Sequence, residues 1–250
     1  MSSEINSSGL TRRSLLTAAS ASAFSFAVAG CSTPQRPDGT RPVPLTQATA
    51  PQVSSTPVSA YAAVIDGGHS IPAVPIDRLD KRFHRQVVSD PTGEAPGTVV
   101  VDVGNHFLYV VQRFGTAMRY GVGLGRAGFE WSGEGVIEWK QHWPRWHPPE
   151  EMIARQPNLQ KYKTEYDPVT REWKGGMEPG INNPLGARAL YIYQNGKDTL
   201  YRLHGSPEWW SIGKSVSSGC VRLINQDVMD LYDRVPEKSK IVVTSGLRVT

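Results

Sequence analysis

The sequence predicts a mainly β fold: a single β-sandwich-like domain with one packed helix and a long tryptophan-rich insert. Three features of the 250-residue chain support this prediction. From residue 98 onward, β-branched and aromatic runs alternate with turn residues, which is typical of strands and hairpins. One amphipathic run near the C-terminus predicts a helix that lies on the sheet. The stretch 97–245 is long enough to form one substantial hydrophobic core.

The predicted strands come mostly as pairs around tight turns. Gly104-Asn105 separates the first two runs, and Asn195-Gly196 separates a later pair. Asn-Gly and similar dipeptides favour the two-residue turns that join antiparallel strands. A short run near the end is expected to close the sheet. The predicted strands are 98–103, 107–111, 120–125, 187–193, 199–204 and 241–244.

One helix is expected after the last hairpin. Asn225 is the predicted N-cap, and Pro236 ends the helix. Between them, apolar residues recur with the spacing of one helix face, and this face would lie on the sheet. These residues are Val228, Leu231, Tyr232 and Val235.

Residues 126–186 interrupt the strand pattern and form the predicted insert. A long segment of this kind within a compact domain is usually functional or disordered. Its tryptophans favour order, and two interpretations stand side by side: the aromatic rings fill the domain's own core, or the segment is a lid that binds substrate. The tryptophans are Trp131, Trp139, Trp143, Trp146 and Trp173.

The first 31 residues are predicted to be an export signal. Thr11-Arg12-Arg13-Ser14-Leu15-Leu16 resembles a twin-arginine signal, and the apolar run after it is too short to cross a bilayer. The run ends at Val28-Ala29-Gly30-Cys31, which resembles a bacterial lipobox. Cys31 is therefore predicted to be lipidated, so that the protein is exported and tethered to the membrane at its periplasmic face. A plain cleaved signal peptide is the alternative.

Residues 32–96 are predicted to connect this anchor to the domain. The part up to residue 58 is rich in Pro, Thr, Ser, Gln and Ala, and such a composition cannot bury a core. We expect it to be a flexible tether. Residues 59–96 are expected to form an extended segment that packs against the β-rich domain.

The chemistry-bearing motif is Ser217-Ser218-Gly219-Cys220-Val221-Arg222, with His204-Gly205 earlier in the chain. A cysteine attacks carbonyls as its thiolate, and an imidazole can take the thiol proton. Small residues before the cysteine leave backbone N–H groups free to face a developing oxyanion. The spacing alone fits equally well a buried structural cysteine near an unrelated histidine.

The net charge argues against nucleic-acid binding, and the number of cysteines argues against a disulfide. The formal net charge is +4, and loss of Glu4, Arg12 and Arg13 with the signal would leave +3. No basic run predicts binding to nucleic acid. The two cysteines are Cys31, at the predicted processing site, and Cys220, in the motif. Because both have other roles, no disulfide is expected.

His-Gly, a gap, and then Ser-x-Gly-Cys-Val-Arg is similar to the signature of the L,D-transpeptidases (YkuD-type catalytic domain) of bacterial cell walls. The resemblance covers residues 97–245, and segments 143–146 and 183–186 also match stretches of similar enzymes. The chain departs from the common pattern at Ser218, where the family most often has histidine. That departure would remove an auxiliary imidazole and leave the base, His204, in place.

The resemblance implies a role for each motif residue. Cys220 would be the nucleophile and His204 its general base, with the Gly205 carbonyl orienting the imidazole. Backbone N–H groups of Gly219 and Cys220, with Ser218 as a further donor, would hold the oxyanion. Arg222 has two interpretations: it binds a substrate carboxylate, or it pairs with an acidic residue and braces the turn.

The resemblance also implies the substrate. The donor would be a peptidoglycan tetrapeptide stem, attacked at its third residue with loss of D-alanine, and the acyl group would pass to an amine. A stem amine would yield a 3→3 cross-link, and a protein amine would attach that protein to the wall. With water as acceptor the protein would be an L,D-carboxypeptidase. A further alternative is a catalytically inactive wall-binding lipoprotein.

Other families with cysteine and histidine fit less well. A sortase has a far longer gap between its histidine and cysteine, and papain-like wall peptidases place cysteine before histidine. A zinc site would need further ligands at metal spacing. We expect neither a metal nor a cofactor.

Overall fold

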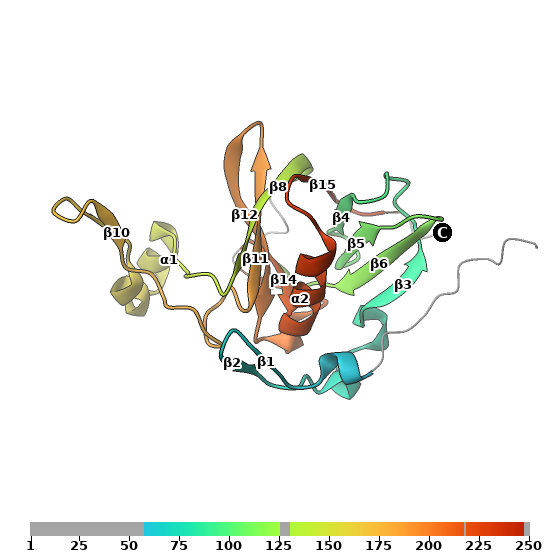
Figure 1. The fold of residues 1–250 in the computed structure, drawn as a ribbon, viewed down its shortest axis with the longest axis horizontal. Helices are drawn as coiled ribbons and strands as arrows, with labels where there is room; N and C mark the ends of the chain where they lie inside the picture. The colour runs from blue at the N-terminus through green and yellow to red at the C-terminus, as the bar shows by residue number, and fades with distance from the viewer. Residues whose placement is uncertain (1–57, 126–130, 218, 248–250) are drawn as a thin grey trace, which may run out of the picture. The chain divides into compact units, whose positions relative to one another are not determined.

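The computed structural model describes residues 58–125, 131–217 and 219–247. They belong to the second of two compact units into which the chain divides, Ala48–Thr250. The predicted export signal and Cys31 lie outside the described residues. The main element is a nine-stranded mixed sheet with the strand order β14-β12-β11-β8-β15-β4-β5-β6-β3 (Figure 1).

Within this sheet, β12 pairs with β14 and β15 with β4 in parallel, and the other neighbouring strands are antiparallel. The strands are β3 (Gln86–Ser89), β4 (Val99–Asp102), β5 (Phe107–Val111), β6 (Thr116–Gly121), β8 (Gly133–His142), β11 (Arg188–Gln194), β12 (Lys197–Ser206), β14 (Val221–Ile224) and β15 (Ser239–Thr244).

Both predicted hairpins are present. The β4–β5 pair flanks Gly104-Asn105, and the β11–β12 pair flanks Asn195-Gly196. Asn195 and Gly196 have φ angles of 52° and 74°. Two successive left-handed residues are what a type I′ turn requires, so the local sequence determines this connection. The strand near the C-terminus, β15, lies in the middle of the sheet, between β8 and β4.

Helix α2 (Asn225–Arg234) packs on this sheet as predicted. Its buried residues Val228 and Leu231 share one hydrophobic cluster with residues of β4, β5, β6, β8, β11, β12, β14 and β15. Figure 1 shows β11, β12 and β14 on one side of α2 and β3, β4, β5 and β6 on the other. The two halves of the sheet thus share a core with the helix, which confirms the mainly β, sandwich-like prediction.

Asn225 does not cap α2, contrary to the sequence-based prediction. The N-cap position is Ile224, and no side chain caps the helix there. The Asn225 Oδ1 atom instead accepts a hydrogen bond from the backbone N–H of Ala187, 3.0 Å away. Its side chain therefore links the start of α2 to the segment before β11.

The predicted insert is wrong at its start, because residues 133–142 form β8 between β11 and β15. The strand was not recognised because Ile137 is its one fully buried residue. Its charged residues have partners far away in the sequence: Lys238 forms an ion pair with Glu138, and Lys140 Nζ donates hydrogen bonds to two carbonyls at the end of α2. Such partners cannot be seen in a local pattern.

The rest of the insert contains short elements: α1 (Glu150–Arg155), the 3₁₀ helix η4 (Pro157–Tyr162), β9 (Glu165–Asp167) and β10 (Glu172–Lys174). The Asn183 side chain joins the two ends of the insert through hydrogen bonds to backbone groups. The Asn183 Nδ2 group donates to the carbonyls of Pro144, Met177 and Glu178, and Oδ1 accepts from the Leu185 N–H. In Figure 1 these elements lie on the side of β11 and β12 that faces away from α2.

Residues 58–89 pack on the same unit. The Tyr61 hydroxyl accepts from the Arg85 N–H at 2.7 Å and donates to Asp227 of α2 at 3.3 Å. Arg85 also contacts Asp230 at 3.2 Å. The elements of this segment are η1 (Val58–Tyr61), β1 (Val64–Asp66), β2 (His69–Ile71), η2 (Ile76–Arg78), η3 (Lys81–Phe83) and β3.

Two further short strands, β7 (Leu124–Gly125) and β13 (Ser215–Ser217), pair in parallel, and the 3₁₀ helix η5 (Trp209–Ser211) follows β12. No helix in the described part of the chain is long and apolar enough to cross a bilayer.

Candidate active site

The parallel pairing of β12 with β14 brings His204 and Cys220 together. Leu203 is the register partner of Val221, so Cys220 lies next to Arg202, two residues along the strand from His204. With strands about 4.8 Å apart and a rise of about 3.3 Å per residue, their Cα atoms are roughly 8 Å apart. This is within the reach of a histidine and a cysteine side chain.

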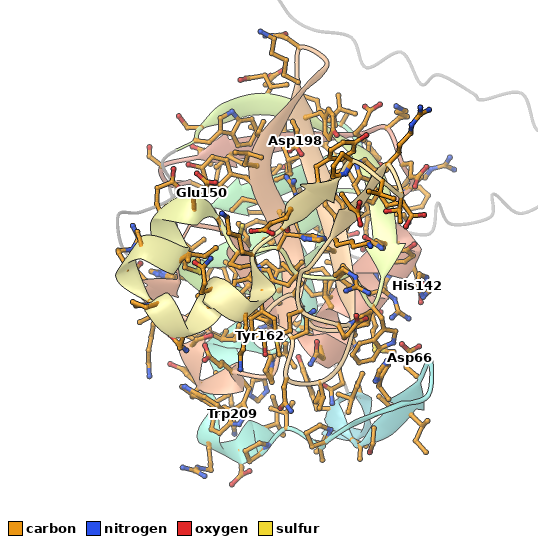
Figure 2. The ribbon with its side chains drawn as sticks, turned by 90° about the vertical axis from the view of Figure 1, so that its left-hand side faces the viewer. Asp66, His142, Glu150, Tyr162, Asp198 and Trp209 are labelled. Atoms are coloured by element: carbon orange, nitrogen blue, oxygen red, sulfur yellow. The ribbon has the colours of Figure 1, made fainter. Side chains whose placement is uncertain are left out.

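Both side chains project from the same face of the sheet. Leu203 and Val221 are fully buried in the main core. Because successive side chains of a strand alternate between faces, His204 and Cys220 point to the opposite, outer face. This outer face lies toward the insert, whose Glu150 and Tyr162 appear in front of β12 in Figure 2.

Cys220 is partly exposed, and its Sγ atom lies 3.9 Å from the carbonyl oxygen of Leu200. The local burial of the sulfur raises the pKa of the thiol, against opposing effects of Arg202 and Arg222. Gly219, immediately before it, has a φ angle of 138°. A residue with a side chain would be strained in that conformation, so the glycine allows the turn that leads into Cys220.

His204 is buried, with 4% of its surface exposed. Its Nδ1 atom lies 2.7 Å from the Gly205 carbonyl oxygen. Since a carbonyl can only accept, Nδ1 carries the hydrogen, and Nε2 is the nitrogen available as a base in the neutral ring. Burial lowers the pKa of His204 to about 4, although the backbone carbonyls of Gly205 and Pro184 act in the opposite direction.

These two shifts determine the resting protonation state. A thiol with a raised pKa and an imidazole with a lowered pKa are both neutral near pH 7. The directions of these pKa shifts favour a neutral imidazole that takes the thiol proton during attack over a standing thiolate–imidazolium pair.

Gly205 is required sterically as well as through its carbonyl. A Cβ atom at Gly205 would lie 2.3 Å from Asn225 Oδ1 and 2.9 Å from a side-chain carbon of Val228. A Cβ atom at Gly186 would meet the same Asn225 oxygen at 2.3 Å. The two glycines thus allow α2 to approach the end of β12 next to His204.

Arg222 forms an ion pair with Glu208, which lies in the loop after β12. Its backbone N–H and carbonyl also pair with Gly123. The sequence left open whether Arg222 binds substrate or braces the turn, and in this structure it has an acidic partner. The contact joins two segments, the loop after β12 and the start of β14, that the folded sheet brings together.

Two of the predicted functional residues lie outside the described residues. Ser218 falls in the gap between 217 and 219, and Cys31 belongs to the undescribed N-terminal segment. Among the described residues, no cluster of three or more His, Cys, Asp or Glu side chains is arranged to hold a metal ion.

The tryptophans have different environments. Trp143 is 8% exposed, and its Nε1 donates to Asp66. Trp131 is partly buried against the main core. Trp139 is 37% exposed and lies on the outer face, where its ring stacks on Tyr191. This last arrangement depends on the pairing of β8 with β11, which the local sequence pattern does not show.

A pocket of about 520 Å³ opens within the insert, apart from the His204–Cys220 pair. None of its lining residues belongs to β12 or β14. They are His147, Pro148, Pro149, Glu150, Ile153, Lys163 and Thr164.

Comparison with known proteins agrees with the motif. Residues 96–243 match the YkuD L,D-transpeptidase catalytic domain. The chain is 28% identical over 239 residues to the probable L,D-transpeptidase YbiS of Escherichia coli K12, covering 88% of this chain and 72% of that protein. It is 31% identical over 232 residues to the probable L,D-transpeptidase ErfK/SrfK of Salmonella typhimurium, covering 88% and 69%.

Among solved structures, one from Brucella melitensis described as a probable carnitine operon oxidoreductase is 45% identical, covering 65% of this chain and 94% of that one, with a TM-score of 0.44. At that TM-score the likeness carries no weight for function.

Proposed function

This chain belongs to the L,D-transpeptidase family, and on that premise we propose that it is a peptidoglycan L,D-transpeptidase with Cys220 as its nucleophile. The Cys220 sulfur would attack the carbonyl of the third residue of a donor tetrapeptide stem. D-Alanine would leave, and the acyl group would pass to an amine. The acceptor is either a stem amine, which yields a 3→3 cross-link, or the amine of a protein that becomes attached to the wall.

The observation that supports the proposal is the placement of His204 on β12 and of Cys220 at the start of the paired strand β14, on the same side of the sheet. The general base and the nucleophile of an acyl transfer must lie within reach of one carbonyl. Here the register of β12 and β14 determines how far His204 is from Cys220. Helix α2 packs on the opposite face of the sheet, close to Gly205. The proposed base and nucleophile are therefore positioned by regular secondary structure, β12 and β14.

The proton and the acyl group can be followed through both steps. The neutral His204 Nε2 takes the Cys220 proton as sulfur bonds to the carbonyl carbon, and His204 then returns the proton to the nitrogen of departing D-alanine. In the second step, His204 takes a proton from the incoming amine. The amine nitrogen bonds to the carbonyl carbon, the thioester carbon–sulfur bond breaks, and His204 returns the proton to the departing sulfur, which restores the thiol.

The oxyanion formed in each step needs nearby donors. We assign this role to the backbone N–H groups of Gly219 and Cys220, with Ser218 as a further contributor. Arg222, held by Glu208, would brace the turn that positions them. In this arrangement a backbone donor remains whatever side chain stands at position 218.

We also propose that the protein acts at the periplasmic face of a membrane, held there by a lipid on Cys31. The resemblance of Val28-Ala29-Gly30-Cys31 to a lipobox supports this location. The composition of residues 32–58 fits a tether that would let the catalytic unit reach the wall polymer.

The decisive experiment is mass spectrometry of muropeptides incubated with the purified protein, with and without the Cys220→Ala substitution. A dimer joined by a 3→3 bond and released D-alanine, both absent with the variant, are the expected result. D-Alanine release with a tripeptide as the only product would instead identify an L,D-carboxypeptidase. If the two proteins leave the muropeptides equally unchanged, the chain is an inactive wall-binding protein.

A further inference from the structure

A stacked aromatic pair lies on the same outer face of the sheet as Cys220 and His204. The rings of Trp139 and Tyr191 have centroids 3.6 Å apart and an angle of 9° between their planes. Trp139 is 37% exposed, whereas Tyr191 is 8% exposed beneath it. On the other side of Tyr191, the Arg202 guanidinium lies 4.4 Å from the ring centroid.

A β-bulge in β8 turns Trp139 toward this face. Ile137 pairs with Ile192, and Trp139 pairs with Tyr191. Between these two pairs, β8 therefore contains one residue more than β11. Without the bulge, Trp139 would share the inner face with Ile137, which is fully buried in the core. Bulges that redirect a single side chain occur often beside functional sites.

The stack is held in place from both ends. The Tyr191 hydroxyl donates to Gln141 Oε1 at 3.0 Å. The Arg202 guanidinium is fixed by two hydrogen bonds to Asp198, 2.6 and 2.7 Å long. Asp198 is the second residue of β12 and is labelled on the β11–β12 hairpin in Figure 2. The exposed face of Trp139 is therefore preorganised, and a ligand would lose little free energy in ordering it.

The strand pairing connects this stack to the nucleophile. Tyr191 is the partner of both Trp139 and Arg202, and the register of β12 with β14 places Arg202 next to Cys220, the residue just before β14. Side chains of these four residues form one row across the sheet. With strands about 4.8 Å apart, Tyr191 is about 10 Å and Trp139 about 14 Å from Cys220.

We propose that Trp139, supported by Tyr191, binds a sugar ring of the glycan strand that carries the donor stem. The inference rests on the proposed function. Three extended residues span roughly 10–11 Å, so a stem attacked at its third carbonyl would bring its sugar end near Trp139. Sugar rings present an apolar face that packs on aromatic rings. The enzyme would then prefer stems attached to glycan over free peptides.

Binding to the Cys220→Ala protein tests this without turnover. Calorimetry would compare a disaccharide-tetrapeptide with the free tetrapeptide of the same sequence. We expect the disaccharide form to bind roughly three- to tenfold more tightly, the size of an aromatic stacking contribution. Adding Trp139→Ala should abolish this difference and leave the free tetrapeptide unaffected, whereas Trp139→Phe should retain most of it.

Phe114→Ala is the matched control, because Phe114 is 92% exposed between β5 and β6, in the other half of the sheet. Equal affinity for the two ligands before Trp139 is changed would overturn the inference. Equal weakening of both by Trp139→Ala would also overturn it, since that indicates a structural role. Release of D-alanine by the protein with Cys220 intact is scored separately, so failure of the transpeptidase proposal is distinguishable from failure of this one.

Discussion

His204 lies on β12 and Cys220 directly precedes β14, the strand that pairs with β12 in parallel, so the two residues are offset by about two positions along the sheet. The Nδ1–H of His204 is already donated to the Gly205 carbonyl. The ring is therefore oriented by backbone, and the carboxylate of a conventional catalytic triad is not needed for that purpose. Several consequences of this arrangement can be measured.

Replacing Cys220 with alanine should abolish acyl transfer and leave the fold intact. The thiol is the proposed nucleophile, and it is partly exposed, so its loss creates little cavity. A carbapenem, which acylates the thiol of similar enzymes, should add its mass to the native protein and not to the variant. Thermal unfolding would serve as the control for folding. A carbapenem adduct on a well-folded Cys220→Ala protein would contradict the assignment.

Replacing His204 with glutamine should slow acylation of Cys220 by roughly 10²–10⁴-fold, the usual size of general acid–base catalysis. Glutamine retains most of the bulk of the buried ring. His147 provides the matched control, because its Nδ1 contacts Thr164 within the insert, apart from β12 and β14. His147→Gln should acylate at nearly the native rate. An equal loss of acylation rate in both variants would indicate that the general base is not His204 alone and that His147 of the insert takes part.

The pH dependence of acylation should reflect the neutral resting pair. The base is the unprotonated imidazole, and burial lowers the pKa of His204 from 6.5 to about 4. Activity should therefore stay nearly constant from about pH 7.5 down to about pH 5.5 and fall only as His204 gains a proton near pH 4. Carbapenem acylation rates across this range would test it. A midpoint near 6.5 would show that His204 titrates like a solvent-exposed histidine.

Tyr61→Phe should lower the free energy of unfolding by about 1–3 kcal/mol, the penalty for leaving a buried polar group unpaired. The lost hydroxyl accepts from the Arg85 N–H and donates to Asp227, so the change weakens the attachment of residues 58–85 to α2. Urea unfolding would measure it. Tyr162→Phe, in the insert, is the control, and an equal loss there would argue against a specific role for Tyr61.

Cys31→Ala should release the protein from the membrane fraction and abolish incorporation of a labelled fatty acid. The prediction follows from the lipobox-like sequence alone. A single lipid chain binds membranes only marginally, so the native protein should carry more than one chain. Fractionation of cells expressing each form would test it, and membrane retention of the variant would indicate a different tether.

Local sequence patterns predicted the parts of the fold that depend on neighbours in the chain. Asn195-Gly196 determined the β11–β12 turn because both residues must adopt left-handed φ angles. The spacing of Val228 and Leu231 predicted the buried face of α2, because helix geometry alone places them side by side. The Ser-x-Gly-Cys-Val-Arg motif likewise named its candidate residues without reference to the fold.

Contacts between distant segments had to come from the tertiary structure. β8 carries mostly exposed and charged residues, and its position in the sheet depends on partners at positions 188–193 and 239–243. The same is true of Asn225, whose side chain bonds to Ala187 instead of capping its own helix. Short-range periodicity contains no information on such pairings, since each is decided by which strand lies beside which.

By itself, then, the sequence determined the hairpins, the amphipathic helix and the identity of the candidate nucleophile and base. The tertiary structure decided that Glu208 faces Arg222 and that a bulge places Trp139 on the outer face with Cys220. The physical reason is register: a shift of one residue moves every side chain of a strand to the opposite face, and only the assembled sheet determines it.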